Sequence, residues 1–150
     1  FWEAIRSKMN VDTKDTHLRS DGEDELFDAK LKQILAEDKN IVMESKLAGF
    51  NAEGITGVFK ILVICENHHG EDQTQIRIDR LVNREGKSVV DAKKEVLERE
   101  KSDLEKWRKM YANDDPNWAY YDPKYYDLVV NTYEHNQEET LKIALGALEP

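Results

Sequence analysis

Two short apolar segments, separated by about 60 residues of helical pattern, constrain the fold of this chain most. They are VFKILVICE at residues 58–66 and YDLVVNT at residues 126–132. The first is almost continuously apolar, which is typical of a strand covered on both faces of a sheet. A third strand is expected at NIVME, residues 40–44. Strands that alternate with helices predict an α/β fold, with a mainly parallel sheet flanked by helices.

The helices are predicted from apolar residues at helical spacing and from the residues that begin and end each helix. Residues 73–85 form one helix, which ends at Gly86. Ser88 begins the next with a Ser-x-x-Asp motif to Asp91, and that helix extends to about Tyr111. Further helices are expected at residues 2–9, 24–37 and 137–148. Because no repeat or linker interrupts this pattern, we expect a single domain over residues 1–150.

The charge of the chain limits the class of its ligand. Its 150 residues include 22 Lys and Arg against 31 Asp and Glu, a net charge of −9. Such a field repels polyanions, so neither a nucleic acid polymer nor an anionic membrane is expected as a partner. Residues 77–111 are different, with 11 Lys and Arg against 8 Asp and Glu. This local positive excess predicts a small anionic ligand.

Cysteine use and hydropathy predict the compartment. Cys65 is the only cysteine, so no intrachain disulfide can form, and no Cys/His spacing indicates a zinc site. The apolar runs are far shorter than the roughly 20 residues that a membrane-spanning helix needs. We therefore expect a soluble, cytoplasmic protein with no metal ligands of its own and no membrane partner. We also expect it to be a monomer.

Five of the seven arginines fall within residues 77–111. Arg77, Arg80 and Arg84 lie within about 60° of one another when plotted at about 100° per residue on the helix at residues 73–85. Guanidinium groups stay charged at any working pH and bind phosphate or carboxylate bidentately. A shared direction therefore predicts that these three side chains act on one anion.

The following helix carries a second charged stripe, in which Arg99, Asp103 and Lys106 stack at i, i+4 and i+7. Two helices joined by the turn at Gly86 can close two charged faces over one ligand. The alternative is a pair of solvated helices with local ion pairs, such as Arg99 with Asp103. The charge pattern alone favours that alternative.

A family resemblance changes this balance. The segment RIDRLVNREGKSVVDAKKEVLEREKSDLEKWRKMY, followed by YYDLVVNT and an acidic last helix, resembles the C-terminal part of the cytidylate kinase family, and the archaeal type most. NIVMESKLAGF is similar to the strand and GRLAGW loop of that family. The helix expected near the start resembles its first monophosphate-contacting helix. The resemblance covers nearly all of the chain.

The resemblance implies a P-loop nucleoside monophosphate kinase fold that transfers the γ-phosphoryl group of ATP to CMP or dCMP, with Mg²⁺. It implies that Arg77, Arg80 and Arg84 are catalytic groups in a lid segment at about residues 73–111. The acceptor-binding residues that it implies are Lys46, Arg99, Asp103 and Lys106. By this resemblance Arg99 holds the acceptor phosphate, and Asp103 orients that phosphate or the base.

The chain also departs from the family pattern. Trp2, Lys46 and Lys106 stand where the family has arginine, and lysine keeps the charge but not the bidentate geometry. No Gly-x-x-x-x-Gly-Lys-Ser/Thr motif occurs in the 150 residues. Because the family places that phosphate loop and the central strand of its sheet earlier in the sequence, we expect further residues before Phe1.

Two other functions stay open at this point. The chain can be a non-catalytic relative that binds a nucleotide or a protein partner. It can also be a helical interaction module that uses residues 77–111 as a partner face, although the two apolar strands argue against that.

Smaller features have ordinary structural explanations. His68 and His69 follow a predicted strand, where α/β proteins bind ligands, but a surface loop is the favoured interpretation. Cys65 is expected to be inert core. An aromatic cluster can stack on a base, although packing of its loop against the last strand is favoured. It comprises Trp118, Tyr120, Tyr121, Tyr125 and Tyr126.

Overall fold

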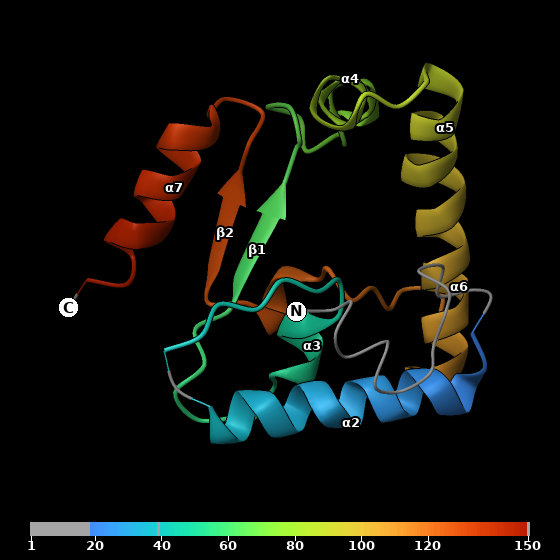
Figure 1. The fold of residues 1–150 in the computed structure, drawn as a ribbon, viewed down its shortest axis with the longest axis vertical. Coiled ribbons are helices and arrows are strands. Elements are labelled where there is room, and N and C mark those ends of the chain that lie inside the picture. Colours follow the sequence, from blue (N-terminus) through green and yellow to red (C-terminus); the bar gives the residue numbers. More distant parts are fainter. Residues whose placement is uncertain (1–18, 39, 150) are drawn as a thin grey trace.

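The protein is described from a computed structural model, which covers residues 19–38 and 40–149 (Figure 1). Within these residues the fold is α/β, as predicted. Two parallel strands lie beside helix α7 and are joined to each other through α4 and the long helix that contains α5 and α6. The helix predicted at residues 2–9, with Trp2, lies outside the described residues.

The sheet pairs β1 (Ile61–Ile64) with β2 (Leu128–Asn131) in parallel, with Ile61 opposite Leu128 and Ile64 opposite Asn131. Both strands were predicted, with longer bounds. The strand predicted at residues 40–44 is wrong, because residues 41–45 have no regular structure and Val42 is fully exposed. The described part of the chain pairs no strand with that segment, and without a ladder its backbone stays irregular.

Coverage of the sheet differs from the prediction that both faces are buried. Leu62 and Val130 are buried, but their in-register neighbours Val129 and Val63 are 39% and 58% exposed. Paired residues of adjacent strands point to the same face, so each face is covered over one strand only. Helix α7 (Gln137–Gly146) contacts β2.

The helix ends largely follow the sequence signals. α2 (Asp21–Glu37) begins three residues earlier than predicted, because Ser20 and Glu23 form a capping box. α4 (Thr74–Glu85) ends at Gly86, whose φ of 65° is left-handed. Ser88 caps the next helix by accepting a hydrogen bond from the amide of Asp91 at 3.1 Å.

That next helix runs without a break through α5 (Val89–Lys93), the π-helical segment η2 (Lys94–Arg99) and α6 (Glu100–Tyr111). The continuous helix was predicted, but its π-helical segment was not. A π-helical turn holds more residues than an α-helical turn, since its hydrogen bonds span one residue more. It therefore changes the direction of the side chains on α5 relative to those on α6.

Two apolar clusters hold these elements together. Ile78 and Leu81 of α4 pack against Ala92 of α5. The larger cluster joins α6 to the short helix α3 (Ala48–Asn51) and to the aromatic loop before the 3₁₀ turn η3 (Pro123–Tyr125). Its buried members are Leu47, Trp107, Trp118 and Tyr120. The loop of Trp118 and Tyr120 is thus packed against α6 and α3, and not against the last strand, as was predicted.

No helix in the described part of the chain is both long enough and apolar enough to cross a membrane.

Candidate functional site

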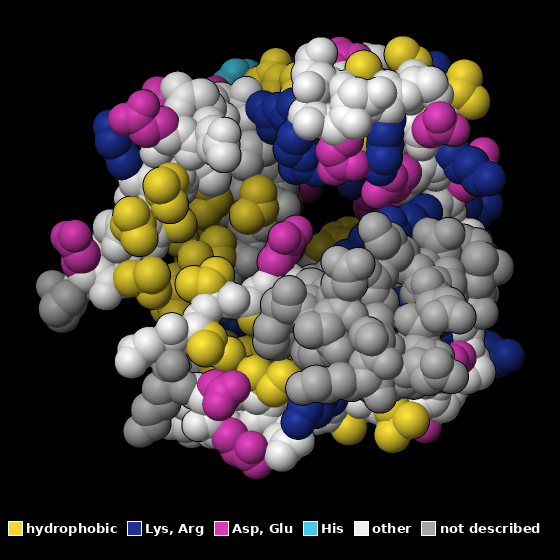
Figure 2. Space-filling model, in the orientation of Figure 1, with side chains coloured by type: hydrophobic (Ala, Val, Ile, Leu, Met, Phe, Trp, Pro, Cys, Tyr) yellow, Lys and Arg dark blue, Asp and Glu magenta, His cyan; other side chains and the backbone are white. Residues whose placement is uncertain are grey.

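The carboxyl ends of β1 and β2 form a well-bonded edge. The amide of Thr132 donates to the carbonyl of Ile64 at 2.8 Å, and the Asn131 side chain exchanges two hydrogen bonds with the backbone of Glu66. Open α/β sheets bind ligands at this edge. Figure 2 shows charged side chains gathered over α4 and the α5–α6 helix, beside an opening on this face of the molecule.

Arg80 of α4 is held at the sheet edge. Its Nη1 donates to Oγ1 of Thr132 at 2.9 Å, and its Nη2 donates to the Thr132 carbonyl oxygen at 2.7 Å. The same guanidinium lies 3.8 Å from the sulfur of Cys65, which is buried as predicted. A planar group with several donors can hold a carbonyl and still present other N–H groups. Arg80 thus fixes α4 to the end of β2.

Arg77 joins α4 to α6. Its Nη1 lies 3.0 Å from Oδ1 of Asp72, and its Nη2 donates to the carboxylate of Glu100. Burial disfavours its charge, but the hydrogen bond and charge of Glu100, with the charge of Asp72, raise the pKa of Arg77. The guanidinium is therefore kept charged between two carboxylates.

Arg84 does not join the other two. Its side chain is 74% exposed and pairs with Glu85, the next residue, at 2.7 Å. The helical spacing places the three arginines on one stripe, as expected, but the stripe extends past the end of the sheet. Arg77 and Arg80 lie toward the strand ends, whereas Arg84 lies in solvent.

The second charged stripe is divided between two places. Lys46, before α3, places its Nζ 2.8 Å from Oδ2 of Asp103, whose side chain is completely buried. Arg99 Nε lies 3.9 Å from the same oxygen, and its Nη1 lies 3.2 Å from Glu95. Lys46, Arg99 and Asp103 are thus together, although Lys46 and Asp103 are 57 positions apart in the chain.

Lys106 lies elsewhere. It is seven residues after Arg99, about 10 Å further along a helix that rises about 1.5 Å per residue. Its Nζ lies 2.7 Å from Oδ2 of Asp24, and it donates to the carbonyl of Arg19 at 2.7 Å. Arg19 also pairs with Asp24, at 2.6 Å. Lys106 therefore holds α6 to the start of α2.

Asp24 is buried, only 3% exposed, and the sequence did not predict this. Asp24 was predicted only as the first residue of the helix at residues 24–37. A sequence signal exists, since Asp24 lies one turn from Asp28 on the same face as Leu31. A carboxylate on an apolar helix face needs a cation or a hydrogen-bond donor as its partner, but the sequence does not identify which residue supplies it.

A polar junction of α2, α3 and α6 was also missed. Asn51 Nδ2 donates to Oδ1 of Asp28 at 2.8 Å, and the Tyr111 hydroxyl donates to the other carboxylate oxygen. Burial raises the pKa of Asp28, although both hydrogen bonds oppose that shift. Burial and the Asp28 carboxylate raise the pKa of Tyr111. The three side chains connect three helices.

The raised pKa of Asp28 predicts that the free energy of unfolding depends on pH. An acid whose pKa is raised on folding binds protons more tightly when folded, so it favours the folded state at low pH. That contribution is lost as the pH rises from the pKa of Asp28 in the unfolded chain, near 3.8, through its raised pKa in the folded protein. We expect Asp28→Asn to remove this fall in the free energy of unfolding, measured by urea unfolding between about pH 3.5 and about pH 7.

Asp38→Asn, at the exposed end of α2, is the matched control and should follow the wild-type pH profile. A wild-type-like profile in Asp28→Asn would show that Asp28 does not cause the fall.

His68 and His69 lie in an exposed loop, as the favoured interpretation predicted. His68 Nε2 is 3.4 Å from Glu134, and its ring meets Tyr133 edge-on. Residues 19–38 and 40–149 contain no group of three or more His, Cys, Asp or Glu side chains arranged to hold a metal ion.

Curated archaeal proteins resemble this chain over almost its whole length. Cytidylate kinase of Archaeoglobus fulgidus is 26% identical over 147 residues, covering 97% of this chain and 74% of that protein. Cytidylate kinase of Methanopyrus kandleri is 28% identical over 152 residues, covering 96% and 68%. Cytidylate kinase of Haloquadratum walsbyi is 30% identical over 150 residues, covering 98% and 71%. No family model and no solved structure matches the chain.

Proposed function

Because this chain belongs to the cytidylate kinase family, we propose that it works in the transfer of the γ-phosphoryl group of ATP to CMP or dCMP. The observation that carries the proposal is that two sets of cationic groups are held by two successive helices, one at the sheet edge and one around Asp103 of α6. Arg77 and Arg80 stand on α4, and Arg99 with Lys46 stands beside the buried Asp103. We propose residues 1–150 as one domain, with a lid at about residues 73–111.

On the donor side, Arg77, Arg80 and Arg84 neutralise charge on the transferring phosphoryl group. Phosphoryl transfer depends on positioning and charge stabilisation more than on covalent help from the protein. Arg77 is held by Glu100 and Asp72, so phosphate oxygens replace these carboxylates when nucleotide binds. Arg84, which is exposed, joins the phosphates only when the lid closes.

On the acceptor side, Arg99 and Lys46 bind the monophosphate, and Asp103 orients both cations. A buried carboxylate that accepts from Lys46 at 2.8 Å fixes the ammonium in place. Lys106, which the resemblance implied as an acceptor ligand, is better placed as a positioning residue. Its contacts with Asp24 and Arg19 hold α6 against α2, and thereby set the position of Asp103 on α6.

ATP and Mg²⁺ enter the proposal as the substrate complex. The 150 residues contain no Gly-x-x-x-x-Gly-Lys-Ser/Thr loop, and the described residues include no cluster of metal-ligating side chains. Residues 19–38 and 40–149 therefore offer no resident metal site, and in this proposal Mg²⁺ is assigned to the ATP phosphates.

A specific observation favours a second function. Lys46 and Lys106 replace family arginines, and each is engaged with a buried carboxylate. Such contacts suit a relative that keeps the fold and binds a nucleotide without turnover.

A monophosphate panel separates the two functions. With the full-length protein, Mg-ATP and CMP, dCMP or UMP, coupled measurement of ADP release should show turnover that depends on a cytidine monophosphate. Omission of the monophosphate serves as the blank. Release that no monophosphate increases would exclude the kinase and leave the non-catalytic relative.

A further inference from the structure

Glu100 lies where the two proposed phosphate-binding sets meet. It is the first residue of α6, directly after Arg99 and three residues before Asp103. Its carboxylate accepts a hydrogen bond from Nη2 of Arg77 on α4, which is 23 positions away in the chain. Within residues 19–38 and 40–149, Arg77 is the one cation that pairs with it. Glu100 therefore connects the donor-side arginine to the helix that carries the acceptor-side residues.

The two carboxylates that hold Arg77 differ in their surroundings. Asp72, just before α4, is 44% exposed, and its second oxygen accepts from the Thr74 hydroxyl at 2.6 Å. Glu100 is 28% exposed. A carboxylate that loses its cation is stabilised by water and by its remaining hydrogen bonds. Displacing Glu100 from Arg77 therefore costs more than displacing Asp72.

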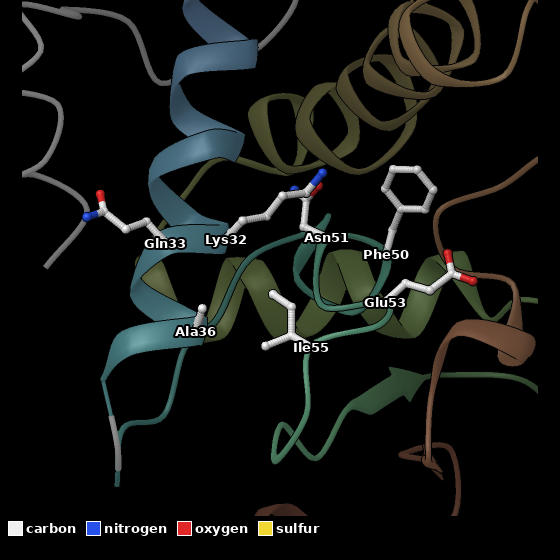
Figure 3. A pocket seen from close by; sticks show the side chains of 7 residues that line it. All are labelled: Lys32, Gln33, Ala36, Phe50, Asn51, Glu53 and Ile55. Atoms are coloured by element: carbon white, nitrogen blue, oxygen red, sulfur yellow. The ribbon is translucent and has the colours of Figure 1, made fainter.

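The ion pair of Arg77 and Glu100 is accessible to a dissolved anion. The two side chains are 33% and 28% exposed, and neither lines the hollow between α2 and α3 (Figure 3). Arg80 holds α4 to the end of β2 through two hydrogen bonds to Thr132. Arg77 can therefore exchange its partner by a rotation of its own side chain while α4 stays in place.

We propose that Glu100 is an internal competitor of the ATP phosphates for Arg77, and that it sets the affinity for ATP. The inference rests on the proposed role of Arg77 in binding the donor. Carboxylate and phosphate oxygens accept from the same guanidinium N–H groups. The apparent affinity of a site falls with the fraction of molecules in which the site is available. Because the pair also joins α4 to α6, ATP that takes Arg77 removes one link between these helices.

Titration calorimetry of the full-length protein with Mg-ATP, without a monophosphate, measures this competition. We expect Glu100→Gln to bind ATP about fivefold more tightly than the wild type, the effect of one ion pair near the surface. Glutamine keeps the shape and an acceptor oxygen, but a neutral acceptor holds a guanidinium less strongly. Asp72→Asn should tighten ATP less, because Asp72 is the more exposed of the two.

A purely structural role for the pair predicts the opposite sign, because loosening α4 from α6 would weaken ATP binding. An ATP affinity of Glu100→Gln that equals the wild type, or falls below it, would therefore overturn the proposal.

Two further variants separate competition from a general effect of charge. Glu105→Gln removes the same charge on the same helix, at a side chain that is 63% exposed and pairs with Lys101, and should leave the ATP affinity unchanged. In an Arg77→Met background, Glu100→Gln should also have no effect, because no guanidinium remains to compete for. An equal gain in the Arg77→Met background would show a long-range field and overturn the proposal.

The outcome is distinguishable from failure of the kinase proposal, because binding of ATP does not require turnover. A non-catalytic relative that binds ATP would still show the gain in Glu100→Gln. ATP binding without that gain would overturn the role of Glu100 alone. Absence of ATP binding by the full-length protein would overturn both proposals.

Discussion

Replacing Gly49 with alanine is expected to lower the free energy of unfolding by about 3 kcal/mol. A Cβ at this position would lie 2.1 Å from Cε1 of Tyr126 and 2.5 Å from its Cζ. The ring cannot move freely, because its hydroxyl donates to the carbonyl of Tyr120 at 2.9 Å. The backbone of α3 would have to shift instead, and with it the buried Leu47 and the adjacent Lys46, whose ammonium contacts Asp103. Urea unfolding measures the change.

Gly22→Ala is the matched control, because a Cβ there meets nothing within 4 Å. Gly22 lies in α2, where alanine is the better helix former, so the change should raise the free energy of unfolding by about 0.5 kcal/mol. Equal effects of the two variants would contradict the close approach of Gly49 to Tyr126.

Replacing Arg99 with methionine is expected to weaken CMP binding at the acceptor site about 100-fold. Methionine keeps much of the side-chain volume but removes the charge and the bidentate donors that hold a phosphate. Loss of one charged partner from a desolvated contact typically costs about 2–5 kcal/mol. Titration calorimetry with CMP measures the affinity of the wild-type protein and of Arg99→Met.

Lys101→Met is the control for that experiment. Lys101 lies two residues from Arg99 on the same helix, is 76% exposed and pairs with Glu105 at 3.9 Å. Its removal changes the net charge by the same amount, so it reports the general effect of one positive charge. If Lys101→Met weakens CMP as much as Arg99→Met, the effect is a long-range field and Arg99 does not contact the phosphate.

The sequence was informative for most local signals, although the capping box of Ser20 and Glu23 at the start of α2 was not predicted. The left-handed Gly86 and the Ser88 cap were predicted because turn and cap chemistry depends on a few adjacent residues. The two strands were predicted from their apolar runs. The prediction for residues 40–44 failed because a strand requires a partner as well as apolar residues, and the exposed Val42 shows that the described part of the chain gives it no cover.

The partners of the charged residues were not predictable in the same way. Helical spacing placed Arg77, Arg80 and Arg84 on one stripe, but the partners of the first two come largely from other elements. Arg77 contacts Glu100, 23 residues away, and Arg80 contacts Thr132, 52 residues away. Such pairs depend on how the helices and strands pack, and this packing cannot be inferred from the charge pattern of one helix.

The central claim is that guanidinium groups on two successive helices bind the phosphates, and arginine NMR tests it most directly. The Nε–H signals of the full-length protein would be followed during titration with CMP and then with ATP. We predict that Arg99 shifts with CMP and Arg77 with ATP, while Arg108, whose Nε donates to the Trp118 carbonyl at 2.8 Å, stays unchanged. Nucleotide saturation that leaves the Arg77 and Arg99 signals in place would contradict the account.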